Sequence, residues 1–82
     1  MKASERLINT EFPLKVFKLH NKNGKPIGVC FYNCEIKDGY FLISDFGTGY
    51  NFEEACEDYL EQIQGKTLVF DAYGNRREIV LI

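Results

Sequence analysis

The side chains of this chain that could do chemistry are three cysteines, one histidine and a group of carboxylates. Nucleophilic catalysis by cysteine needs a histidine beside the thiol, and zinc needs several Cys or His ligands at short spacing. His20 stands in a different segment from Cys30, Cys34 and Cys56. We therefore expect buried thiols that behave as small apolar side chains. We expect no catalytic residue, no metal site and no cofactor, so the chain does not resemble an enzyme.

A disulfide is not expected either. The odd number of cysteines, in a chain whose first residues lack the apolar core of a signal peptide, argues against a disulfide framework. Cys30 and Cys34 fall in one predicted strand, on the same face but about 13 Å apart along it. That separation is too large for a disulfide between them.

The glycine-rich segment Phe46–Asn51 precedes a predicted helix, where an anion could bind to free backbone N–H groups. It lacks the lysine and the spacing of a phosphate-binding loop. A tight turn between a strand and the helix explains both glycines, so we predict no phosphate site here.

Carboxylates gather on the predicted helix, which contains no Lys or Arg. One interpretation is a surface for a basic protein partner; the other is a solvated face that keeps the protein soluble. The candidate contact residues are Glu53, Glu54, Glu57, Asp58 and Glu61.

Basic residues gather in the first half, where residues 1–37 carry seven Lys or Arg against three Glu. Basic groups beside exposed rings are typical of surfaces that bind single-stranded nucleic acid. A net charge of −2 and a pI of about 5.3 oppose nonspecific binding of nucleic acid. The alternative site for nucleic acid comprises Lys15, Lys18, Lys22, Lys25, Tyr32 and Tyr40.

One amphipathic helix must position the carboxylates. Its start is predicted by Asn51 as N-cap with Glu54 three residues later, the spacing of a capping box. Gly65 can adopt the left-handed conformation that ends a helix. Between them, apolar residues recur at helical spacing. They are Phe52, Ala55, Cys56, Tyr59, Leu60 and Ile63.

Alternating apolar residues and turn signals predict antiparallel strands around this helix. The Asn-Gly of segment 21–25, the Asp38-Gly39 pair and segment 72–77 are the expected turns. The result is an α+β fold with an antiparallel sheet in the order β-β-β-α-β-β, and one amphipathic helix on one face. The last residues, IVLI, are apolar on both faces, so we expect them inside the sheet or against a partner. The predicted strands are 14–20, 27–36, 40–45, 66–71 and 78–82.

The 82 residues are expected to form a single domain. Residues 1–13 are predicted as either a flexible arm or a short helix that Ser4 caps and Pro13 ends. No apolar run is long enough to span a membrane, and we expect a cytoplasmic protein. Because one helix cannot cover both faces of the sheet, we also expect a homodimer.

The segment GTGYNFEEACEDYLEQIQGKTLVFDAYGNRRE resembles the C-terminal half of small uncharacterised proteins of phages and prophages of Gram-positive bacteria. Those proteins share a glycine loop, an acidic helix and a GKTLVF-type strand. The resemblance implies an accessory protein that acts in the host cytoplasm. From the acidic helix face we expect this role to be non-enzymatic and to act through an unidentified protein partner.

A second resemblance is to HicB-type antitoxins, in which a glycine turn and an E-E-A stretch open a helix after three strands. It is carried here by Gly49, Phe52, Glu53, Glu54 and Ala55. It implies an antitoxin-like partner domain.

Overall fold

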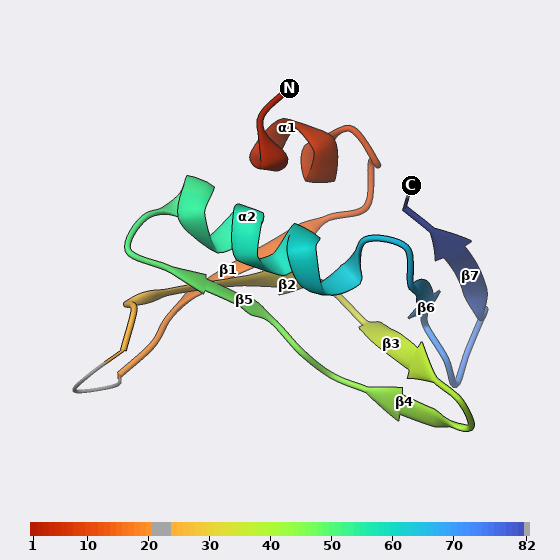
Figure 1. The fold of residues 1–82 in the computed structure, drawn as a ribbon. Coiled ribbons are helices and arrows are strands. Elements are labelled where there is room, and N and C mark those ends of the chain that lie inside the picture. Colours follow the sequence, from red (N-terminus) through yellow and green to blue (C-terminus); the bar gives the residue numbers. More distant parts are fainter. Residues whose placement is uncertain (21–23, 82) are drawn as a thin grey trace.

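The computed structural model describes residues 1–20 and 24–81, and it has the predicted α+β class with antiparallel sheets (Figure 1). The strands form two small sheets; a longer central helix packs on one of them, and a short N-terminal helix packs on the central helix. The elements are α1 (Ala3–Ile8), β1 (Leu14–Lys18), β2 (Ile27–Phe31), β3 (Cys34–Asp38), β4 (Phe41–Ile43), β5 (Gly47–Gly49), α2 (Phe52–Ile63), β6 (Thr67–Phe70) and β7 (Arg77–Val80).

The strands form two sheets, in the orders β1-β2-β5 and β4-β3-β6-β7, with all pairs antiparallel. The prediction of one strand over 27–36 was wrong, because the chain turns at Tyr32 and Asn33 and passes from the first sheet to the second. Asn33 has a φ of 48°, a left-handed conformation that asparagine tolerates better than most residues. The premise that Cys30 and Cys34 share a straight strand is therefore wrong too.

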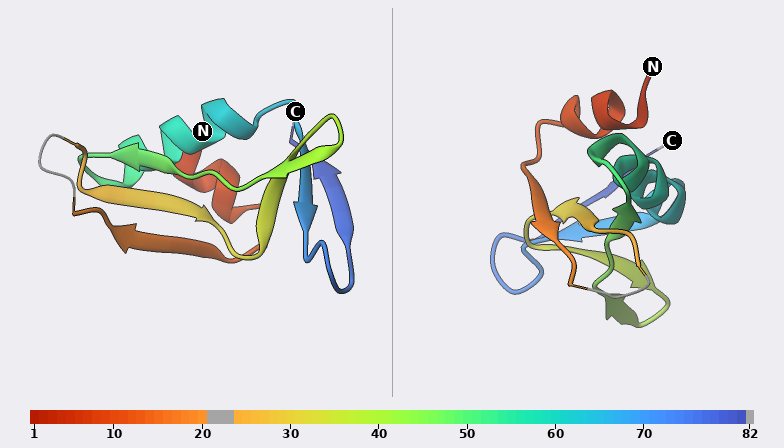
Figure 2. Two further views of the ribbon diagram at one scale, coloured as in Figure 1. Left: turned by 90° about the horizontal axis from the view of Figure 1, so that it is seen from below. Right: turned by 90° about the vertical axis from the view of Figure 1, so that its left-hand side faces the viewer.

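Helix α2 begins and ends as predicted. The side chain of Asn51 accepts a hydrogen bond from the backbone N–H of Glu54 at 2.9 Å, and Gly65 has a φ of 79°. Its predicted apolar stripe is buried except for Phe52, which is 37% exposed. The stripe packs against β2 and β5, so the helix covers one face of the first sheet. Figure 2 shows the opposite face from below, with the strands in front of both helices.

Strand β5 lies where the sequence predicted a loop. Two of its three residues are glycines that press against α2. A Cβ on Gly47 would lie 2.3 Å from the carbonyl oxygen of Ala55, and one on Gly49 would lie 2.3 Å from the nitrogen of Ala55. Close contact between helix and strand therefore requires both glycines, rather than a tight turn.

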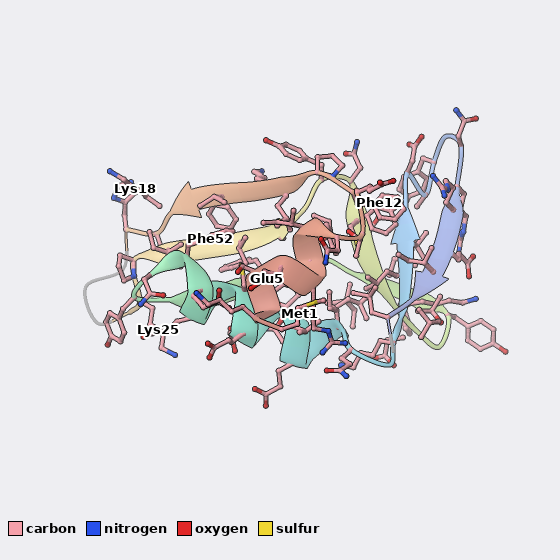
Figure 3. The ribbon with its side chains drawn as sticks, turned by 90° about the horizontal axis from the view of Figure 1, so that it is seen from above. Met1, Glu5, Phe12, Lys18, Lys25 and Phe52 are labelled. Atoms are coloured by element: carbon pink, nitrogen blue, oxygen red, sulfur yellow. The ribbon has the colours of Figure 1, made fainter. Side chains whose placement is uncertain are left out.

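Of the two alternatives for residues 1–13, the structure has the short helix, α1. It lies on α2 (Figure 3). Ser4 is inside the helix rather than its cap, because Lys2 holds the N-cap position. Phe12 follows the helix and stacks on Phe70 with ring centroids 4.0 Å apart, which ties the N-terminal segment to the second sheet.

The second sheet departs from the prediction at two places. The β3–β4 connection is Gly39–Tyr40, one residue later than predicted, with Asp38 still paired to Phe41. Strand β7 lies at the edge of the sheet and Val80 is 49% exposed, so the expectation that the C-terminal segment lies inside the sheet was wrong. The alternative, that it lies against a partner, stays a prediction. Ile82 and most of the predicted turn at 21–25 lie outside the described residues. In the part of the chain that the structure describes, no helix is long and apolar enough to cross a membrane.

Candidate functional site

Two of the five candidate carboxylates are used at the start of α2. Glu53 accepts hydrogen bonds from both the backbone N–H and the hydroxyl of Ser4, which fastens α1 to α2. These bonds, with the charge of Lys2 nearby, hold the pKa of Glu53 below its ordinary value. Glu54 accepts from the backbone N–H of Tyr50 at 3.2 Å, one residue before the N-cap, and from the side-chain amide of Asn51 at 3.3 Å. The reciprocal bond predicted for a capping box, to the backbone N–H of Asn51 itself, is thus replaced by these two.

A third carboxylate joins the helix to the first sheet. Asp58 accepts from the backbone N–H of Thr48 at 2.8 Å and from the side-chain amide of Gln62 at 3.1 Å. The same amide of Gln62 donates to the carbonyl of Phe46 at 3.2 Å. Asp58 therefore satisfies a backbone group of β5, and its side chain lies on the flank of the helix.

The two remaining carboxylates, Glu57 and Glu61, lie on the exposed side of α2, as does the capping residue Glu54. Glu54, Glu57 and Glu61 are exposed, and their spacing of three and four residues places them along one strip of the helix. No hydrogen bond or ion pair joins Glu57 or Glu61 to another of the described residues. We call this strip the acidic ridge. It is what remains of the predicted acidic face once Glu53 and Asp58 are assigned to packing.

The alternative site for nucleic acid is not brought together as one surface. Lys18 and Lys25 lie at the β1–β2 end of the molecule (Figure 3), whereas Tyr40 lies at the β3–β4 turn, at the opposite end in Figure 1. Lys15 lies 5.7 Å from the ring centroid of Phe17, and Tyr32 is half-exposed between the two ends. Lys22 lies outside the described residues.

The face of the first sheet that α2 does not cover holds a groove of about 590 Å³, which we call the outer groove. Strand alternation places Lys15, Phe17 and Cys30 on this face, because Val29 and Phe31 point into the core. The Phe17 ring packs against Gly28, where a Cβ would be 2.4 Å from a ring carbon, and its centroid lies 5.2 Å from that of Phe46 in an edge-to-face arrangement. The other walls come from β3, from residues 44–46 and from residues 71–73.

Two lining residues of the outer groove, at the bend between the sheets and after β6, have left-handed backbone conformations. Asn33 and Asp71 have φ values of 48° and 52°, and the backbone N–H of Asp71 donates to the carbonyl of Asn33 at 2.9 Å. This bond connects the bend between the sheets to the β6–β7 turn. Sequence reasoning missed the groove, because its walls come from segments about 60 residues apart.

The thiols in the outer groove are not activated. Burial raises the pKa of Cys30, and it raises the pKa of Cys34 to about 11 despite a hydrogen bond from Tyr59. The Tyr59 hydroxyl also accepts from the backbone N–H of Phe31 at 3.2 Å, so it satisfies a buried donor at the bend. Protonated thiols are poor nucleophiles and poor metal ligands. Among the described residues, no group of His, Cys, Asp and Glu could hold a metal ion.

No family model matches this chain, and neither the curated proteins nor the solved structures give a match. Nothing therefore tests the resemblance to phage proteins or to HicB-type antitoxins. The residues that carry the second resemblance do have structural roles here: Gly49 contacts α2, Glu53 bonds Ser4 and Glu54 caps the helix.

Proposed function

We propose that this protein is a non-enzymatic interaction module, and that its acidic ridge binds a basic surface of another protein. The observation that supports a contact role for the ridge is that the helix carboxylates differ in their bonding. Glu53 and Asp58 turn inward to hold α1 and β5, while Glu57 and Glu61 remain exposed without a partner among the described residues.

Charge supplies the physical reason for a basic partner. Helix α2 carries five carboxylates and no Lys or Arg, so like charges along the ridge repel one another. A partner that brings Lys or Arg against the ridge relieves this repulsion and is steered to it at low salt. The phage-type resemblance supports an accessory protein of this kind acting in the cytoplasm of a bacterium.

The test is an affinity pull-down from bacterial lysate, with and without nuclease. The ridge variant is Glu57→Lys/Glu61→Lys, which spares Glu53, Glu54 and Asp58 because the fold uses them. The matched control, Glu5→Lys/Asp38→Lys, makes the same charge change at exposed residues outside α2. A protein captured by wild type and by the control, but not by the ridge variant, supports the proposal. Equal capture by all three contradicts it.

The second candidate is binding of single-stranded nucleic acid through the exposed Lys15, Lys18 and Lys25. The stacked position of Lys15 on Phe17 favours it, since basic groups beside rings suit a nucleic-acid strand. Capture that nuclease abolishes and that the ridge variant retains would favour this candidate over the ridge.

A HicB-like antitoxin role is a special case of the first proposal, in which the basic partner is a toxin. Capture of a small basic protein by wild type, lost with the ridge variant, would support that narrower role. Capture of only large or acidic proteins would contradict it.

A further inference from the structure

The outer groove combines an apolar floor with a charged rim. Its lining includes Phe17 and Cys30 on the outer face of the first sheet, and Cys34 just after the bend. Both thiols are neutral because burial raises the pKa of each. Tyr32 and Tyr73 stand at the rim, 52% and 95% exposed. A volume of about 590 Å³ lies within the range of sites that hold a ligand group.

The rim is negative overall. Glu35, Asp45 and Asp71 line the groove, against Lys15 as the one cation among its described lining residues. Asp45 accepts from the backbone N–H of Phe46 at 2.8 Å, and Asp71 accepts from that of Asn75 at 2.9 Å. Each bond occupies one carboxylate oxygen and fixes the orientation of the group, and both oxygens of Asp71 lie close to Gly74. Glu35 is the rim carboxylate whose two oxygens make no hydrogen bond or ion pair with a described residue, so it has both to offer a ligand.

The groove already receives a cation from its own chain. The ammonium group of Lys15 lies 5.7 Å from the centroid of the Phe17 ring, within the range of a cation–π contact. A positive group is thus compatible with this floor, and the two exposed tyrosines offer further ring faces. An anionic ligand would meet three carboxylates instead.

We propose that the outer groove binds an arginine side chain presented by a partner protein. The methylene stem of arginine suits the apolar lining of Phe17, Cys30 and Cys34. Its planar guanidinium stacks on aromatic rings and can pair with the two oxygens of Glu35 through two parallel hydrogen bonds, which an ammonium group cannot do. The groove is open to solvent on one side, so it suits a side chain on a polypeptide better than a free small molecule.

This groove and the acidic ridge are separate surfaces, since the groove lies on the sheet face that α2 does not cover. The proposal therefore does not depend on the proposed function.

The test is a titration of the full chain, followed by backbone amide chemical shifts in NMR, with a capped Gly-Arg-Gly peptide. The control is the same peptide with citrulline, which has the shape of arginine without its charge. We expect saturable shifts at residues 30–35, 45–46 and 71–73 with the arginine peptide and none with citrulline. Absence of saturation, equal shifts with citrulline, or shifts confined to α2 would overturn the proposal. So would binding of free arginine without binding of the capped peptide.

Variants sharpen the test. Glu35→Gln removes a rim charge that has no side-chain partner among the described residues, and Tyr73→Ala removes a ring that is exposed and outside the core. Each should weaken binding of the arginine peptide at least threefold. Lys15→Gln should leave it unchanged or tighter, because the internal cation is removed. Glu57→Gln/Glu61→Gln should have no effect. Unchanged binding in both Glu35→Gln and Tyr73→Ala would overturn the proposal, and the amide spectrum itself reports whether each variant is folded.

Discussion

The carboxylate of Glu53 in α2 accepts hydrogen bonds from both the backbone N–H and the hydroxyl of Ser4 in α1. A carboxylate that the sequence pattern assigns to a contact surface thus holds the two helices together. The same bonds explain why the pKa of Glu53 is lowered, since they stabilise its charged form.

Loss of the Ser4–Glu53 contact should loosen α1. Ser4→Ala and Glu53→Gln should each lower the free energy of unfolding and speed amide exchange in α1, and the double variant should be little worse than either single one. Because the pKa of Glu53 is lowered in the folded state, its contribution is full above the ordinary pKa of glutamate. It is lost as the pH falls through the lowered value. If the effects of the two single variants add up in the double variant, the contact is not shared as described. The account is also contradicted if the stability difference between wild type and Glu53→Gln grows as the pH falls.

The glycines of β5 should not tolerate a side chain. Gly47→Ala and Gly49→Ala place a Cβ 2.3 Å from backbone atoms of Ala55, and overpacking of this kind costs about 1–3 kcal/mol. Gly39→Asn is the control, because its φ of 61° suits asparagine and nothing lies within 4 Å of the added Cβ. Denaturant unfolding measures all three. Wild-type stability in either alanine variant would show that α2 does not rest on β5 as described.

The bend between the sheets should depend on the conformational tolerance of Asn33. Asn33→Ala should lower the free energy of unfolding by about 1 kcal/mol, because alanine is disfavoured at a φ of 48°. Asn33→Gly should be close to neutral. If Asn33→Gly is less stable to thermal unfolding than Asn33→Ala, the left-handed conformation is not the reason that asparagine stabilises the bend.

The helix cap offers a fourth comparison of stability. Asn51→Ala removes the acceptor for the N–H of Glu54 and should cost about 1 kcal/mol, whereas Asn51→Asp keeps it. Chemical unfolding of the two variants measures the difference. Equal stabilities would mean that the cap contributes nothing.

The cysteines should react slowly in the native protein. With the pKa of Cys34 and Cys56 raised to about 11, only about one thiol in a thousand is ionised at pH 8. Alkylation by iodoacetamide, followed by mass spectrometry, should therefore be far slower than for a small free thiol, and unfolding in urea should restore the rate. Fast native labelling at Cys34 would contradict the buried, protonated state.

Local signals explain what the sequence predicted well. The start and end of α2 follow from Asn51, Glu54 and Gly65, whose effects act within one helical turn. The bend at Asn33 could not be predicted, because no glycine or proline marks it. What selects it is the pairing of β2 with β5 and of β3 with β6. Strand β5 was missed for a related reason: glycines usually argue against a strand, and here contact with α2 requires them.

The candidate site also has features that the sequence predicted and features that it did not. The concentration of carboxylates on α2 was visible in the sequence, but their roles depend on groups far along the chain, namely Ser4 for Glu53 and Thr48 for Asp58. The outer groove has no sequence signal, since Lys15, Glu35 and Asp71 meet only after the chain bends between its two sheets.

The most direct test of the acidic ridge is the dissociation constant of a purified captured partner, measured by calorimetry at two salt concentrations. Wild type and Glu5→Lys/Asp38→Lys should bind alike, and binding should weaken with salt. Glu57→Lys/Glu61→Lys should bind at least tenfold more weakly than both. A ridge variant that binds as tightly as wild type would show that the ridge is a solvated helix face and not the contact surface.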